Sequence, residues 1–119
     1  MKGIIKFKKS DDLLYIDIEY TPLKIEKGLM FRKRLNENKG ILFILPEYKK
    51  IYIWMKNTYI PLDVLFIKDD TIVDIISNTE PLSKKKISTL KNHNIILEVN
   101  SNYCKNHNIK IGDKFEIKV

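Results

Sequence analysis

The stretch WMKNTYIPLDVLFI occupies residues 54–67 and places a polar and aromatic segment directly before a run of apolar residues. Residues 64–67 have the length and the β-branched and aromatic composition of a buried strand. Residues 54–63 combine a tryptophan, a lysine, an asparagine and an aspartate, a mixture unlike the usual filling of a strand or loop. We therefore expect residues 54–63 to form a site and residues 64–67 to lie in the core.

One apolar segment precedes this stretch and a second overlaps its first residues, and both predict strands at the centre of a sheet. Residues 41–45 are apolar throughout and end at Pro46. Residues 51–55 are also apolar on both faces, and alternation places Tyr52 and Trp54 on the same face. Strands that are buried on both faces have this kind of continuous apolar sequence, so we expect both segments in the middle of the sheet.

Hairpins are predicted on both sides of these segments. Residues 63–67 and 71–76 are separated by a Lys-Asp-Asp turn. Near the N-terminus, residues 13–20 alternate with period two, which indicates a half-buried strand, and residues 3–7 form a shorter apolar segment before them. A polar Lys-Ser-Asp-Asp turn joins the two and completes a hairpin over residues 3–20.

Two short helices are expected. Thr21 can cap the first, Pro22 suits its first position, and Gly28 ends it because glycine adopts the left-handed conformation freely. The second extends from Asn100-Ser101, which can cap it, to Asn108. Each helix is an accessory to the strands.

The remaining segments complete the fold prediction. Residues 78–94 lack periodicity and predict a long loop, whereas residues 95–99 and 115–119 predict strands. Seven or eight short strands with frequent turns favour a mainly β fold, either a β-sandwich or a closed β-barrel. The length of 119 residues indicates a single domain over residues 1–119 that includes the N-terminal hairpin.

Composition restricts the environment and the class of function. The net charge is +7, but 20 of the 22 basic residues are lysine and only Arg32 and Arg34 are arginine. Together with 20 isoleucines and no alanine or glutamine, this profile is typical of an AT-rich prokaryotic genome, archaeal or bacterial, and lysine enrichment also suits a hot habitat. Arginine is favoured for specific phosphate and base contacts, so we expect a solvated lysine surface and no specific nucleic-acid binding.

The lack of a recognisable signal peptide or membrane segment also restricts the expected environment. Lysines interrupt the apolar residues at the N-terminus, no apolar run reaches the roughly 20 residues of a membrane helix, and the single Cys104 excludes an internal disulfide. We therefore expect a soluble, cytoplasmic protein that is a monomer or a weak homodimer.

Several short motifs occur in an order that resembles a known family. The motifs are GLMFR (28–32), GILF (40–43), WMKNT (54–58), PLD (61–63), IV (72–73), Pro81, LE (97–98) and GD (112–113). This set resembles domain of unknown function 192, a widespread prokaryotic family, from about residue 22 to the C-terminus. The resemblance implies a compact, mostly β single domain and no established activity.

The chain departs from the family pattern at two points. Family members usually have a glycine shortly after the Leu-Glu pair, where this sequence has Asn100-Ser101-Asn102-Tyr103. Asparagine tolerates the left-handed conformation, so the turn can be kept. Many bacterial relatives begin with an export signal, and we expect none here because lysines interrupt the apolar residues at positions 1–8.

The candidate site is a polar and aromatic pocket around residues 54–63. Trp54 and Tyr52 could form a stacking surface, or they could fill the core. Polar donors directly after an aromatic strand residue can orient a ligand. The residues expected to bind the ligand are Met30, Arg32, Trp54, Lys56, Asn57 and Asp63.

Asp63 has two interpretations. By alternation it shares a face with Leu65 and Ile67, so a structural aspartate would need Arg32 or the amides of the Asn57-Thr58 turn as partners. A functional Asp63 could instead face Glu98 as the second carboxylate of a minimal, glycosidase-like hydrolase. Asp63 and Glu98 are the carboxylates that could be catalytic, and both signals are weak.

Cys104 and His107 are three residues apart on an expected helix and could share a side. Helix spacing alone explains this placement, and zinc normally requires more ligands than these two with His93. We therefore expect neither a metal site nor a cofactor, and we keep a catalytic Cys-His pair only as a formal possibility.

The function predicted first is a binding module, with enzyme activity left open. Its ligand would be a small polar, anionic or carbohydrate-like molecule or a peptide, because Trp54 can stack and Arg32 and Lys56 carry positive charge. The first alternative is the hydrolase with Asp63 and Glu98. The second alternative is a nucleic-acid or protein-interaction domain that uses the lysine-rich surface.

Overall fold

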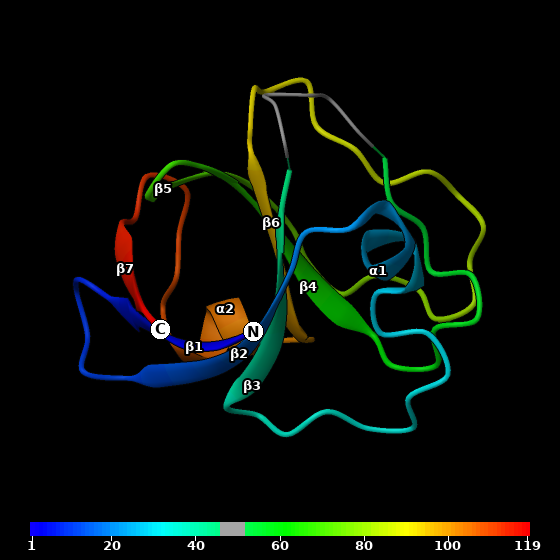
Figure 1. Ribbon diagram of the computed structural model, residues 1–119, viewed down its shortest axis with the longest axis horizontal. Helices are drawn as coiled ribbons and strands as arrows, with labels where there is room; N and C mark the ends of the chain where they lie inside the picture. Colours follow the sequence, from blue (N-terminus) through cyan, green and yellow to red (C-terminus); the bar gives the residue numbers. More distant parts are fainter. Residues whose placement is uncertain (46–51) are drawn as a thin grey trace.

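The computed structural model describes residues 1–45 and 52–119, and in these residues seven strands form one strongly curled sheet (Figure 1). The strand order across the sheet is β5-β4-β6-β3-β2-β1-β7. Neighbouring strands are antiparallel except for β2 and β3, which are parallel. The strands are β1 (Lys2–Phe7), β2 (Leu13–Glu19), β3 (Lys39–Ile44), β4 (Leu62–Lys68), β5 (Thr71–Ile76), β6 (Ile95–Asn100) and β7 (Phe115–Lys118), and the helices are α1 (Pro22–Lys27) and α2 (Tyr103–Asn106).

The curled sheet is a half-barrel, so the expected β-sandwich or closed β-barrel is wrong. The two edges of the sheet approach each other at one end only. There, the backbone N–H of Ile72 donates to the carbonyl of Asp113 at 3.0 Å, and Thr71 forms an isolated bridge with Lys114. A closed barrel requires a continuous ladder between its edge strands, and here the contacts join residues 70–72 to residues 112–115, so β5 and β7 themselves form no ladder.

The sheet buries side chains on both of its faces. The inner face, inside the curl, carries a cluster that includes Leu42, Leu65 and Leu97, and α2 contributes Tyr103 and Cys104 to it. The outer face carries a second cluster that includes Ile41, Phe43, Val64, Phe66 and Ile96. Because β3, β4 and β6 contribute to both clusters, their continuous apolar sequences follow directly from their position.

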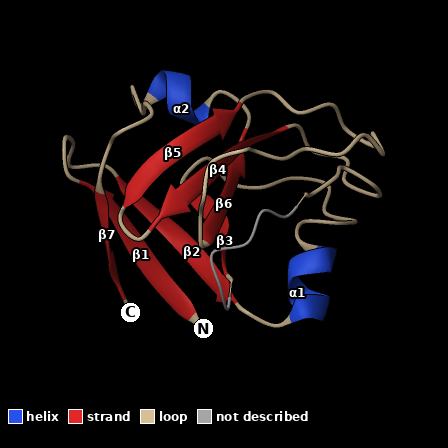
Figure 2. Ribbon diagram, turned by 90° about the horizontal axis from the view of Figure 1, so that it is seen from above, coloured by secondary structure: helices blue, strands red, loops and turns tan. Residues whose placement is uncertain are grey.

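The two helices lie on opposite sides of these middle strands, α2 inside the curl and α1 outside it (Figures 1 and 2). The expected start and end of α1 are confirmed. The hydroxyl of Thr21 accepts a hydrogen bond from the backbone N–H of Lys24 at 3.3 Å, and Pro22 is the first helical residue. Gly28 ends the helix with a φ of +47°, a conformation that favours glycine. No helix in the described ranges is long and apolar enough to cross a membrane.

The expected strand over residues 51–55 is wrong in its described part. Within residues 52–55, only Ile53 makes a strand-like bridge, and its partner is Ile87 in the long loop after β5. The backbone N–H of Met55 donates to the carbonyl of Ser83 at 2.9 Å. The apolar residues of this segment are therefore buried by a loop over the outer face and not by a ladder in the sheet. Ile51 and the expected turn at 46–50 lie outside the described residues.

Candidate functional site

A pocket of about 420 Å³ lies outside the curl, between α1, the outer face of the sheet and residues 52–58. Its walls come from segments far apart in the sequence. The residues that line it are Pro22, Ile25, Glu26, Lys27, Gly28, Leu29, Met30, Phe43, Leu45, Tyr52, Ile53, Trp54, Thr58 and Glu98.

A backbone hydrogen bond holds two of these segments together. The N–H of Phe31, in the turn after α1, donates to the carbonyl of Asn57 at 2.8 Å. Both residues have a positive φ, +66° for Phe31 and +57° for Asn57. For a bulky residue such as Phe31 this conformation is uncommon and disfavoured, so the surrounding contacts must impose it. The contact places Met30 and Trp54 on the same pocket.

Glu98 is the buried ionisable group of this pocket. Glu98 lies on β6, opposite Ile41 of β3 on one side and Val64 of β4 on the other. Only 5 % of its surface is exposed. Among residues 1–45 and 52–119, no hydrogen bond or ion pair reaches its carboxyl group. Burial raises the pKa of Glu98 from its ordinary value of 4.5 to about 7. A carboxyl group with this pKa changes its charge near neutral pH.

The Glu98 carboxyl group faces the end of α1. A Cβ atom placed on Gly28 would lie 3.2 Å from Oε1 of Glu98 and 3.8 Å from the carbonyl oxygen of Ile25. Glycine is therefore favoured at position 28 for its positive φ and for the space it leaves beside the carboxyl group.

Tyr52 and Trp54 form an aromatic part of the pocket wall. Their ring centroids are 6.5 Å apart and their planes are nearly perpendicular, at 78°. Trp54 is half-buried and Tyr52 is exposed, so neither belongs to the core. Each ring has a lysine ammonium group over it, Lys56 at 5.2 Å from the Trp54 centroid and Lys86 at 4.6 Å from the Tyr52 centroid. The two rings are thus stacking surfaces that attract cations.

The structure separates the six residues expected to bind a ligand. Met30 and Trp54 line the main pocket. Lys56 and Asn57 line a smaller depression beside it, which Met30 and Trp54 also border. Arg32 lines two other depressions.

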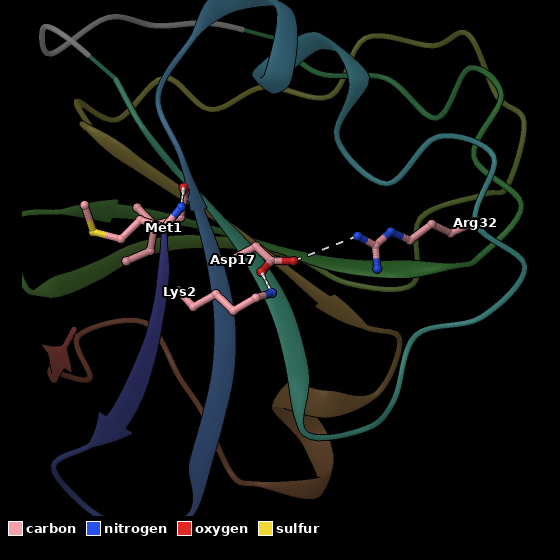
Figure 3. Close-up of polar contacts among 5 residues, drawn as sticks. Met1, Lys2, Asp17 and Arg32 are labelled. Atoms are coloured by element: carbon pink, nitrogen blue, oxygen red, sulfur yellow. Dashed lines mark hydrogen bonds and ion pairs between the residues drawn. The ribbon is translucent and has the colours of Figure 1, made fainter.

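Arg32 pairs with Asp17 on β2, so the expected Asp63–Arg32 bond is wrong (Figure 3). The Arg32 guanidinium is 3.9 Å from Oδ2 of Asp17, and the Lys2 ammonium is 2.5 Å from Oδ1. The hydrogen bond from Lys2 lowers the pKa of Asp17, and the charges of Lys2 and Arg32 lower it further against the effect of partial burial. Asp17 therefore neutralises part of the basic charge at this position.

Asp63 is 1 % exposed and accepts two backbone hydrogen bonds. The N–H of Asn78 donates to Oδ1 at 3.0 Å, and the N–H of Cys104 donates to Oδ2 at 3.1 Å. Cys104 is in the first turn of α2, where the preceding Asn102 makes no side-chain cap. Asp63 thus caps α2 from a distant strand, in place of the expected cap at Asn100-Ser101 and of the expected amides of the Asn57-Thr58 turn.

Asp63 and Glu98 lie on opposite faces of the sheet. Val64 is the residue of β4 directly opposite Glu98, and Asp63 is opposite Val99. Side chains directly opposite each other share a face, and adjacent residues point to opposite faces. Asp63 therefore points into the curl and Glu98 points out of it. The expected pairing of these two carboxylates across one cleft is wrong.

The chain is similar to proteins of a known family. A family model, DUF192 ("Uncharacterized ACR"), matches residues 5–117, nearly the whole chain. The chain belongs to the DUF192 family.

Two solved structures are similar to this DUF192 chain over almost its full length. One is a "putative transcription regulator" from Sinorhizobium meliloti 1021, with a TM-score of 0.93, 32% identity, and coverage of 98% of this chain and 93% of that one. The other is a protein of unknown function from Novosphingobium aromaticivorans DSM 12444, with a TM-score of 0.88, 28% identity, and coverage of 97% and 83%. A comparison with curated proteins gave no match.

Cys104 and His107 of the DUF192 chain have separate surroundings. Burial and, to a smaller extent, the nearby Asp63 together raise the pKa of the Cys104 thiol to about 12, so the reactive thiolate is disfavoured. Nδ1 of His107 is 2.7 Å from Asp12, and its ring stacks on Tyr103 at 4.0 Å. Within the described ranges, no three His, Cys, Asp or Glu side chains are grouped so as to hold a metal ion.

Sequence reasoning missed most of the pocket of this DUF192 protein. It predicted Met30 and Trp54 and considered Tyr52 as a stacking residue, but it considered Glu98 only as the partner of Asp63 and did not place Ile25, Gly28 or Phe43 at a site. One signal was available. Glu98 is the single charged residue in a strand that is otherwise apolar on both faces, and a charge at such a position requires a partner or a function.

Proposed function

We propose that this DUF192 protein is a binding module that takes a small molecule into the pocket between α1 and the outer face of the sheet. The observation that carries the proposal is the position of Glu98, a buried carboxyl group without a partner among the described residues, in a pocket whose other buried lining residues are mostly apolar. Ligand pockets commonly combine an apolar lining with a few convergent polar groups.

The energetics of Glu98 support this proposal. Burying an ionisable group without a partner destabilises a protein, and an apolar residue at this position would avoid that cost. Departures of this kind from the rules of good packing concentrate at functional sites. A ligand that donates hydrogen bonds to the Glu98 carboxyl group would therefore explain why an ionisable residue is kept at this position.

The pocket favours binding over catalysis. Among the described residues, the other ionisable residues that line it are Glu26, Lys27 and Tyr52, all of them exposed, and Asp63 lies on the other face of the sheet. A carboxylate pair for glycoside hydrolysis must flank a single bond, an arrangement that Glu98 and Asp63 cannot provide. The ligand we propose is a compact molecule with an apolar or aromatic body and one polar end.

The test is a screen of small fragments that combines thermal shift with NMR chemical-shift mapping, because a selective ligand raises apparent stability. The pocket variant is Trp54→Ala, and the matched control is Tyr59→Ala, which removes an exposed aromatic residue of the same segment outside the pocket. We expect fragments that bind the wild-type protein and Tyr59→Ala to bind Trp54→Ala at least tenfold more weakly. Absence of binding, or binding that Trp54→Ala leaves unchanged, would overturn the proposal.

The S. meliloti relative suggests nucleic-acid binding as a second candidate for this chain. We propose that any such binding through the lysine-rich surface is weak and nonspecific, because Asp17 is close to Arg32 and the remaining basic surface is mostly lysine. Binding to a DNA duplex should then weaken steeply between 50 and 200 mM salt, as expected for phosphate contacts alone. Sub-micromolar, sequence-selective binding at physiological salt would contradict this.

A further inference from the structure

We propose that the ligand of the pocket is an organic primary ammonium ion, whose N–H groups donate to the Glu98 carboxylate while its apolar or aromatic body lies against Phe43, Leu29 and Trp54. This inference rests on the proposed binding function and specifies the chemistry of the ligand. Three features of the pocket lead to it.

The first feature is the supply of hydrogen-bond acceptors beside Gly28. The Glu98 carboxylate can accept several hydrogen bonds, and no described residue donates one to it. The carbonyl oxygen of Ile25 lies on the same side, 3.8 Å from the point where a Gly28 Cβ would be. A primary ammonium group has three donors and a positive charge, so it matches a buried carboxylate in charge and in hydrogen bonding.

The second feature is the aromatic wall. The nearly perpendicular rings of Tyr52 and Trp54 each attract a lysine ammonium group of the protein itself. Lys56 reaches Trp54 from the smaller depression and does not line the main pocket, and Lys86 lines neither. The surfaces that these two aromatic residues present to the main pocket can therefore contribute further attraction for a cation.

The third feature is the charge at the pocket and its rim. Within residues 1–45 and 52–119, the charged or titratable residues that line the pocket are Glu26 and Lys27 of α1, Tyr52 of the loop and Glu98 of β6. An anion would bring a second negative charge to a buried carboxylate that no described cation neutralises. Arg32 and Lys56, which suggested an anionic ligand in the sequence, line other depressions.

Binding of an amine should depend on pH in a defined direction. Burial raises the pKa of Glu98 to about 7, so its carboxyl group is largely ionised at pH 8 and largely protonated at pH 6 in the free protein. An aliphatic amine stays protonated over this range. The affinity should therefore fall about tenfold from pH 8 to pH 6, because a proton must be removed from Glu98 before the cation can bind.

The experiment compares four probes that share a phenyl ring and differ in their polar end, by calorimetry and NMR at pH 8. The probes are 2-phenylethylamine, 2-phenylethanol, phenylacetate and the trimethylated phenylethylammonium ion. We expect the primary amine to bind wild-type protein at least tenfold more tightly than the other three. The trimethylated ion keeps the charge but has no N–H donor, so it separates hydrogen bonding from charge.

The key variant is Glu98→Gln, which keeps the shape of the side chain and removes the negative charge. We expect it to weaken binding of the amine at least tenfold, to leave binding of the alcohol unchanged, and to abolish the pH dependence. Titration of the wild-type protein between pH 6 and 8 tests the same point without a variant.

The outcomes distinguish the two proposals. If none of the four probes and no fragment binds the pocket, the binding function itself fails. If the alcohol, the carboxylate or the trimethylated ion binds as tightly as the amine, or if Glu98→Gln binds the amine normally, the binding function stands and the amine inference is overturned.

Discussion

Asp63 and Glu98 are two buried carboxyl groups on adjacent strands, and the structure treats them in opposite ways. Asp63 points into the curl and accepts backbone N–H groups from Asn78 and Cys104. Glu98 points outward into a pocket and has no such partner in residues 1–45 and 52–119. The comparison teaches that burial alone does not separate a structural acid from a functional one. The hydrogen-bond partners of the carboxyl oxygens make the distinction.

The largest effect should come from removing the structural acid. Asp63→Ala leaves two buried backbone N–H groups without an acceptor and removes the cap of α2, so we expect a loss of about 3–5 kcal/mol in the free energy of unfolding. Asp63→Asn keeps one acceptor and should cost less, roughly 1–3 kcal/mol. Urea unfolding at pH 7 measures both. The exposed Asp11→Ala serves as control, and a loss below about 1 kcal/mol in Asp63→Ala would remove the contrast with Glu98.

Removing the charge of Glu98 should increase the free energy of unfolding at pH 8, whereas the Asp63 substitutions decrease it. The pKa of Glu98 is higher in the folded protein than in the unfolded chain, so its contribution to stability is fully present below about pH 4.5 and is lost as the pH rises through 7. Glutamine mimics the protonated acid. We therefore expect Glu98→Gln to be more stable than wild type by about 3 kcal/mol at pH 8 and nearly equal to it at pH 4.

Urea unfolding of both proteins at pH 4 and pH 8 tests this prediction. Subtracting the free energies of unfolding of the two proteins at each pH removes the contribution of the other titrating groups, which both proteins share. A Glu98→Gln protein that is less stable than wild type at pH 8 would mean that the carboxylate has a structural partner like that of Asp63.

A smaller effect on stability is expected at Gly28, which lies beside Glu98. Gly28→Ala must adopt a positive φ and brings a methyl group to about 3.2 Å from the carboxyl oxygen, so we expect a loss of about 1–2 kcal/mol and weaker amine binding. Gly112→Ala is the matched control, because Gly112 also has a positive φ but faces open space. It should lose stability and keep full amine binding in the same calorimetric assay.

The smallest effects are expected at Asn57 and Lys56, which line the smaller depression beside the pocket and whose side chains do not support the fold. The Asn57 carbonyl that accepts from Phe31 belongs to the backbone and survives substitution. Asn57→Ala should therefore cost under about 1 kcal/mol, mainly because alanine tolerates the positive φ less well than asparagine. Lys56→Ala loses a cation–π contact with Trp54 and should cost about 0.5–1 kcal/mol. Melting temperatures measure both, and a loss above about 2 kcal/mol in Asn57→Ala would make this segment part of the scaffold.

The local structure of this protein could be read from its sequence. Alternation over residues 13–20, the turn between β4 and β5, and the Thr21-Pro22 start and Gly28 end of α1 all occur where they were predicted. These features depend on side-chain periodicity, on capping and on the conformational freedom of glycine, which act within a few residues. The ordered motifs also predicted the family, which the family model confirms.

The curl of the sheet, the route of residues 52–55 and the partners of the buried charges were decided only by the tertiary structure. Each depends on which distant segments meet. The register between β4 and β6 places Glu98 opposite Val64 and so puts Asp63 on the other face. Cys104 in the first turn of α2, 41 residues from Asp63 in the chain, donates one of the hydrogen bonds that Asp63 accepts. Asp17 lies beside Arg32, where Asp63 was expected. Local sequence determined the elements because their energetics are local, whereas strand register and hydrogen-bond satisfaction are set by contacts that exist only once the sheet has formed.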